Sequence, residues 1–168
     1  VEGILELPRY VSLESRLGTV VVVEAQINGA EGSSISYIEL RPPANAEYLV
    51  YAEGFGMTIT GVIFQGMTQP VTGVVLTPPG MGISFPGKVD FETVIENCLF
   101  TGLNIGIDIY GEPPLLRRNI FRNIAYHALV VRAEIKSSFL KSLGDADNPE
   151  AGFNTFEDST GGADVSNE

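Results

Sequence analysis

The sequence predicts an all-β solenoid, in which short strands wind into about seven or eight stacked coils. Three observations predict this fold class. A phenylalanine recurs in five similar segments, apolar residues alternate with period two after it, and the composition favours turns over helices. The 168 residues include 19 glycines and 10 prolines, whereas charged residues make up only 18%. We expect a single domain over 1–168, because this length suits one sizeable core.

The first third of the chain contains strand-like segments whose register relative to one another is not evident. They read YVSLES, TVVVVEAQ, SISYIEL and YLVYAE, and they are rich in β-branched and aromatic residues, which favour strands. We therefore expect residues 1–54 to form less regular coils at the N-terminal end of the solenoid.

The phenylalanine repeat covers the rest of the chain. Its members are spaced by 36, 21, 18 and 17 residues. We interpret the first interval as one coil enlarged by a protruding loop, residues 77–87, and the other intervals as single coils. One coil cannot bury its apolar face alone, so stacking would place phenylalanine on phenylalanine. The five are Phe64, Phe100, Phe121, Phe139 and Phe156.

A polar corner and a second strand are expected after each phenylalanine. Glycine and asparagine dominate two residues after it, as expected where a tight corner needs a positive φ. These corner positions are Gly66, Gly102, Asn123, Lys141 and Asp158. Apolar residues follow at seven and nine positions after the phenylalanine, which predicts equivalent strands. They are Ile107 and Ile109, Ala128 and Val130, and Ala163 and Val165.

Four segments carry a resemblance to a known family: MTITGVIFQG, VIENCLFTGLNIGIDIYG, LLRRNIFRNIAYHALVV and LGDADNPEAGFNTFEDSTGGADVSN. They resemble a right-handed parallel β-helix of the pectate-lyase-like superfamily, in particular its uncharacterised DUF1565 type. The resemblance implies the fold over residues 55–168 and raises the prospect of activity on polysaccharides. The chain departs from the enzymes of that superfamily, because it has no Asp-Asp pair, no Gly-His-Gly and no Arg-x-Lys, and it lacks tryptophan.

Composition excludes several kinds of partner. The net charge is −11, and the ten lysines and arginines form no basic stripe, so nucleic acid and anionic membrane surfaces are not expected partners. No apolar run approaches the roughly 18 residues of a membrane span. The one cysteine, Cys98, cannot form an intrachain disulfide, and its apolar neighbours predict a buried thiol.

Candidate carbohydrate-binding residues gather in and near the segment RRNIFRNIAYHALVV. Its three arginines could hold the carboxylates of an acidic sugar, or they could serve an internal ion-pair network or an acidic neighbour. A lone histidine is more often a surface or rim residue than a base. Two aromatic residues in or beside loops could stack on sugar rings, whereas most other tyrosines are expected to be part-buried. The candidates are Arg117, Arg118, Arg122, His127, Tyr110 and Phe85.

The asparagines of the same segment have a structural interpretation. Asn119 stands two residues before Phe121, where asparagine can stack in a ladder, and Asn123 occupies the corner. We therefore expect neither asparagine to bind a ligand.

An acidic stretch near the C-terminus is the best candidate for a cation site. Calcium prefers six to eight oxygen ligands, and GDADN supplies several close together. A solvated acidic loop is the alternative. The candidate calcium ligands are Asp145, Asp147, Asn148 and Asp158.

These observations favour a non-catalytic structural or adhesive module, located outside the cell or on its surface, that associates with copies of itself into a larger assembly or filament. A parallel solenoid leaves unpaired strand edges at its ends, so we expect the N-terminal coil to be covered by another chain, by further sequence or by the irregular first segment. The alternative is a carbohydrate-binding or polysaccharide-degrading module, a lyase or a hydrolase. No cofactor is expected beyond the candidate calcium ion.

Overall fold

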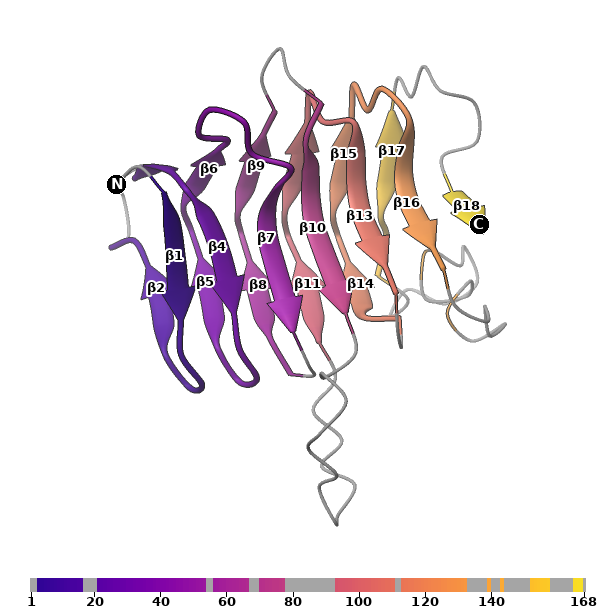
Figure 1. Cartoon of the computed structure of the whole chain (residues 1–168). Coiled ribbons are helices and arrows are strands. Elements are labelled where there is room, and N and C mark those ends of the chain that lie inside the picture. Colours follow the sequence, from indigo (N-terminus) through magenta and orange to yellow (C-terminus); the bar gives the residue numbers. More distant parts are fainter. Residues whose placement is uncertain are drawn as a thin grey trace.

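The chain forms a parallel β-helix in a computed structural model, and the predicted solenoid is confirmed (Figure 1). The structure describes residues 3–16, 21–53, 56–66, 70–77, 93–110, 113–132, 139, 143, 152–157 and 165–167. Every strand pair in this part of the chain is parallel, and the strands form three sheets, which we call A, B and C. The first five coils each pass through A, then B, then C, whereas the sixth has described strands only in A and C. Figure 1 shows the resulting ladder of strands from the N-terminal to the C-terminal end.

The strands are short because each one crosses a single face of the solenoid. Sheet A contains β1 (Ile4–Leu7), β4 (Gln26–Gly29), β7 (Tyr48–Glu53), β10 (Thr72–Thr77), β13 (Ile105–Ile109), β16 (His127–Val131) and β18 (Val165–Asn167). Sheet B contains β2 (Ser12–Glu14), β5 (Ser34–Ser36), β8 (Thr58–Thr60), β11 (Val94–Glu96) and β14 (Leu115–Arg117). Sheet C contains β3 (Val22–Glu24), β6 (Glu39–Arg41), β9 (Ile63–Gln65), β12 (Leu99–Thr101), β15 (Ile120–Arg122) and β17 (Thr155–Glu157).

The core consists of inward columns in which equivalent residues of successive coils lie on one another. The phenylalanines of sheet C form one column, with ring centroids 4.5 Å, 4.7 Å and 5.1 Å apart and nearly parallel planes. In register, the column runs through Phe64, Phe100, Phe121 and Phe156. The first interval is therefore one enlarged coil, as predicted. Thr77, where the protruding loop 77–87 was predicted to begin, ends β10, and residues 78–87 lie outside the described residues. Offset-stacked rings add to the energy of burial.

Phe139 does not belong to this column, so its assignment to a separate coil was wrong. Strand β15 pairs directly with β17, and Phe121 is the partner of Phe156. Phe139 is helical and buried in the core, and Leu143, which is also helical, packs against the same core. A spacing of four residues places two side chains on one face of a helix and equally on one face of a strand, so the sequence pattern did not separate the two. Lys141 and Asp158 lie outside the described residues.

The predicted register of β16 was wrong by one residue. Ile107 and Ile109 pair with Leu129 and Val131, and not with Ala128 and Val130. All five residues of β16 are buried, so its sequence shows no alternation that would reveal the register. The corner before β16 is one residue longer than the corner before β13. Val165 pairs with Leu129, whereas Ala163 lies outside the described residues.

The corners between sheets use residues with positive φ. Gly102 and Asn123 have φ of 65° and 52°, as predicted for the corner after sheet C. Gly66 does not need a positive φ; it is required because a Cβ there would collide with the carbonyl of Gly102. The corner from sheet B to sheet C also uses a left-handed residue in four successive coils, which the sequence did not reveal. These residues are Tyr37, Gly61, Asn97 and Arg118.

Asparagines extend an inward column at the corner from sheet B to sheet C. Asn119 is fully buried; its Nδ2 donates to the Ile95 carbonyl at 2.8 Å, and its Oδ1 accepts from the Cys98 N–H at 3.0 Å. The Oδ1 of Asn154 accepts from both the backbone N–H and the Nδ2 of Asn119. The structural roles predicted for Asn119 and for the corner residue Asn123 are confirmed. A buried amide is stable here because its polar atoms are paired.

Truncating the centre of the phenylalanine column should destabilise the whole fold. Phe100→Ala is expected to lower the free energy of unfolding by about 3–5 kcal/mol, because Phe100 is fully buried between two other rings. Urea denaturation followed by circular dichroism measures this loss. Phe153→Ala is the matched control, since Phe153 is exposed and its removal should cost less than about 0.5 kcal/mol. Equal effects of the two substitutions would contradict the packing described above.

Candidate functional site

The outer face of sheet A is the surface richest in aromatic and polar side chains that contact one another. It presents a cluster that we call the tyrosine patch, and strands β1, β4, β7 and β10 each contribute to it. Its members are Glu6, Asn28, Tyr48, Tyr51 and Thr77. The two tyrosines are half-buried and stand three residues apart in β7, with two buried residues between them. Their rings contact each other, so both lie on the same side of the sheet.

Hydrogen bonds link the tyrosine patch across four strands. The Tyr48 hydroxyl donates to Asn28 Oδ1 at 3.3 Å, and Asn28 Nδ2 donates to Glu6 Oε1 at 2.8 Å. The Thr77 hydroxyl donates to the Tyr51 hydroxyl at 3.3 Å. The two rings lie 5.5 Å apart and are tilted by 44°. The pKa of Tyr48 is raised, first by burial and then by Tyr51, Glu6 and Glu47, so the phenol stays neutral and donates.

A second polar cluster lies on sheet A toward the C-terminal end. The guanidinium of Arg132 forms two hydrogen bonds to the buried carboxylate of Asp108, at 2.9 Å and 3.2 Å. The same guanidinium lies 5.1 Å from the centre of the Tyr110 ring. Such a bidentate pair orients the side chain of Arg132. Asp108 and Arg132 were not predicted from the sequence, because neither belongs to a motif and the two meet only through strand pairing.

His127 also belongs to sheet A, but it is not on the surface. It is 9% exposed at the start of β16, and its ring contacts Tyr126 edge-on with centroids 4.1 Å apart. The expectation of a surface or rim position does not hold. His127 pairs with Ile105 at the start of β13, whereas Tyr110 follows the last residue of β13, so these two predicted carbohydrate-binding residues lie at opposite ends of neighbouring strands.

The three predicted arginines lie on other faces. Arg117 ends β14 in sheet B, Arg118 forms the adjacent corner, and Arg122 ends β15 in sheet C. Arg122 forms an ion pair with Glu157 at 2.7 Å, which agrees with the alternative of an internal ion pair. The structure therefore does not bring the arginines together with Tyr110 and His127. Phe85 lies outside the described residues.

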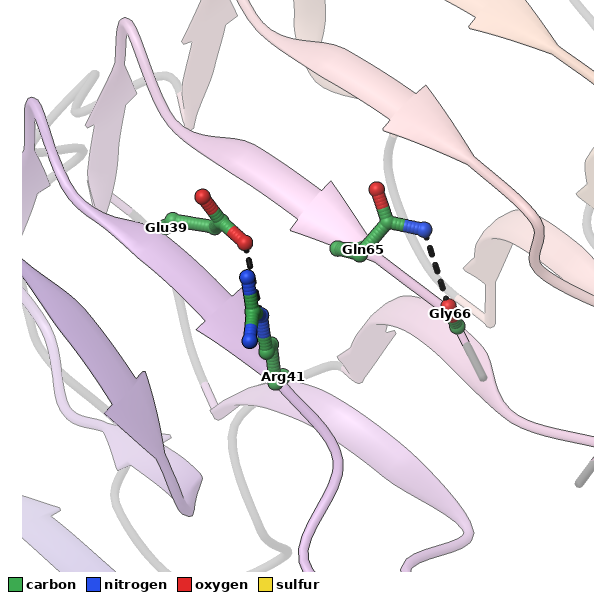
Figure 2. A network of polar contacts seen from close by, with 4 residues as sticks. All are labelled: Glu39, Arg41, Gln65 and Gly66. Atoms are coloured by element: carbon green, nitrogen blue, oxygen red, sulfur yellow. Dashed lines mark hydrogen bonds and ion pairs between the residues drawn. The ribbon is translucent and has the colours of Figure 1, made fainter. Parts of the chain in front are cut away.

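The outer face of sheet C is occupied by local polar contacts, which Figure 2 shows on two neighbouring strands. Arg41 lies along Glu39 of its own strand, with Nε 2.7 Å from Oε1. Gln65 turns to the next residue and donates from Nε2 to the carbonyl of Gly66 at 2.9 Å. Exposed ion pairs of this kind contribute about 0.2–1 kcal/mol, so we assign this network a modest structural role.

Within the described ranges, no three histidine, cysteine, aspartate or glutamate side chains are close enough to hold a metal ion. The four predicted calcium ligands, Asp145, Asp147, Asn148 and Asp158, lie outside these ranges. In the same part of the chain, no helix has the length and apolar character needed to cross a membrane.

The fold and the contacts on sheet A define the chain as a parallel β-helix protein with a polar and aromatic outer face. Comparisons of the sequence with protein-family models, with curated proteins and of the structure with solved structures found no match.

Cys98 is a core residue and not a nucleophile. Its thiol donates to the carbonyl of Glu96 at 3.2 Å, and burial is the main cause that raises the pKa of Cys98 to about 12. A thiol with that pKa is almost entirely protonated at neutral pH, and reaction with electrophiles requires the thiolate.

The Cys98 thiol should therefore react only after unfolding. At pH 8 we expect iodoacetamide to leave Cys98 unmodified in the native protein and to alkylate it in denaturing urea. Intact-mass spectrometry measures the added group. A Cys98→Ala chain controls for alkylation at other residues. Rapid labelling of the native protein would show that the thiol is accessible.

Proposed function

We propose that the chain is a non-catalytic structural or adhesive module that associates with copies of itself, outside the cell or at its surface. The observation that carries this proposal is the open first coil. The inward residues of that coil are only partly buried, whereas their partners in the second coil are completely buried. The partly buried residues are Leu5, Leu13 and Val23, and the buried partners are Ile27, Ile35 and Leu40.

Several outer and edge positions of the first coil are apolar as well. Large hydrophobic side chains are exposed there at Ile4, Tyr10, Val11, Val21 and Val22. Strands β1, β2 and β3 are the terminal strands of their sheets, so each presents an edge to which no described strand pairs. Exposed apolar surface next to unpaired strand edges favours association with another polypeptide.

The non-catalytic part of the proposal rests on the sequence, which lacks the paired aspartates and the other signatures of the pectate-lyase-like enzymes that it resembles. The same resemblance, including that to the DUF1565 type, supports an extracellular location. The candidate calcium site in the C-terminal acidic stretch belongs to this proposal as a stabilising ion.

Association through the first coil should be visible in solution. We expect the mean mass from multi-angle light scattering to rise with protein concentration, and electron microscopy of concentrated samples to show elongated particles. Val22→Lys should suppress this rise, because it places a charge on the exposed edge strand. Ile120→Lys is the matched control, since Ile120 occupies the same outward column and is similarly exposed, at 37% against 43%. A mass that stays monomeric at every concentration would refute self-association.

The tyrosine patch favours a second function, carbohydrate binding. Two half-buried tyrosines beside an amide and a carboxylate combine ring faces for stacking with groups that pair with hydroxyls. Tyr110 adjoins the patch, because its N–H donates to the carbonyl of Leu76, the residue before Thr77. His127 begins β16, two strands beyond β10. Degradation of a polysaccharide, by a lyase or a hydrolase, is the catalytic form of this alternative.

Carbohydrate binding at the tyrosine patch can be tested by affinity electrophoresis in gels that contain neutral or acidic polysaccharides. We expect at least one polysaccharide to retard the protein and Tyr51→Ala to abolish the retardation, because the substitution removes one of the two rings. Tyr126→Ala is the control, since Tyr126 is exposed and lies outside both the patch and the first coil. Lack of retardation by all polysaccharides would eliminate this second function.

A further inference from the structure

One backbone hydrogen bond recurs between successive coils on sheet C. In every coil from the second onward, the first residue of the sheet C strand donates its N–H to a carbonyl of the preceding coil, at 2.8–3.0 Å. The acceptor always stands immediately before the first residue of the preceding strand. The five bonds run from Glu39 to Val21, from Ile63 to Ile38, from Leu99 to Val62, from Ile120 to Cys98, and from Thr155 to Asn119.

At one end of the described sheet C lies a donor N–H of this type, and at the other end lies an acceptor carbonyl. Val22 begins β3, which is the terminal strand on the N-terminal side, so its N–H occupies the donor position with no preceding strand in the described part of the chain. Strand β17 is the terminal strand on the other side, and the carbonyl of Asn154, just before it, occupies the acceptor position. One end therefore presents the donor and the other presents the acceptor of the same repeated contact.

The inward columns match in the same way. Val23 of the first coil and Phe156 of the last strand of sheet C are both only partly buried, and both pack against the core on one side. They lie at the same register position, because the column of Val23 passes through Leu40 and the phenylalanines to Phe156. Placing one end on the other would continue this column and bury both side chains.

Sheet B differs from sheets A and C at the C-terminal end. Gly152 lies against Leu116 and Arg117 so closely that a Cβ on it would collide with them. This contact covers the edge of β14, the terminal strand of sheet B. Sheets A and C end in the strands β18 and β17, to which no described strand pairs on the far side. A joint between two ends would therefore use sheets A and C.

We propose that copies of the chain join head to tail, with the first coil of one copy placed on the last strands of the next and the Val22 N–H donating to the Asn154 carbonyl of that neighbour. This inference rests on the proposed self-association and names its geometry. Successive coils are complementary along a solenoid, so the first described coil and the last described strands are complementary to each other, which favours a second copy as the partner. A head-to-tail contact uses two different surfaces, so it continues into a filament.

Cysteine cross-linking tests this geometry directly. The proposed joint makes Val22 of one copy the register partner of Thr155 of the next, and paired parallel strands are close enough for a disulfide. In a Cys98→Ala background, we expect mixed Val22→Cys and Thr155→Cys chains to form a disulfide-linked dimer on mild oxidation. A chain with both substitutions should give a ladder of linked species. Ile63→Cys, in the middle of the same column, should link to neither.

The cross-links also distinguish the proposed head-to-tail geometry from self-association through another contact. If Val22→Cys chains link efficiently to each other and not to Thr155→Cys chains, the contact is head to head. That result would overturn the head-to-tail geometry and leave self-association in place. A protein that remains monomeric by light scattering and forms no cross-link would overturn both.

Proline substitution tests the hydrogen bond. Val22→Pro removes an N–H to which no strand of the described residues pairs, and proline is tolerated at the first residue of an edge strand. We expect this substitution to abolish the rise in mass and to leave the melting temperature nearly unchanged. Ser12→Pro is the matched control, because Ser12 begins β2, whose counterpart edge in sheet B is covered by Gly152. Assembly that persists in Val22→Pro, or that is lost equally in Ser12→Pro, would contradict the proposal.

Discussion

The structure depends on in-register stacking of equivalent side chains in successive coils. A coil in the middle of the chain has no core of its own, and each of its inward side chains is buried by the equivalent side chains above and below it. The phenylalanine column shows this constraint most clearly, because three consecutive ring contacts have nearly the same spacing and orientation. Burial therefore propagates along the solenoid, and it is weaker in the first described coil, at Leu5, Leu13 and Val23.

Stacking also explains why polar residues are accepted inside the core. The column that begins with Ile38 and Val62 continues through Cys98 to Asn119 and Asn154. Each asparagine pairs with backbone groups at the tight corner from sheet B to sheet C. A single buried amide without partners would be costly, but a ladder of them pairs with the same corner carbonyls in successive coils. The left-handed residues at that corner, Arg118 among them, set the corner geometry that aims these side chains inward.

The outward positions are free of this constraint, so the three faces differ in chemistry. Sheet A presents tyrosines and a buried aspartate–arginine pair, sheet C carries exposed ion pairs, and sheet B presents hydroxyls such as Ser12 and Ser34, which are 2.7 Å apart. Ligand recognition is thus expected on a face and assembly at an end. The two proposed functions use different parts of the molecule and are compatible in one protein.

The sequence by itself determined the fold class, because the inward phenylalanines and the corner glycines and asparagines recur at intervals set by the length of a coil. It could not determine whether residues 121–156 formed one coil or two, since a buried phenylalanine in a helical turn resembles one in a strand. Nor could it reveal the tyrosine patch, whose hydrogen bonds join residues 20 to 26 positions apart. Loop lengths vary from coil to coil, so only the pairing of strands in the tertiary structure decides which outward side chains become neighbours.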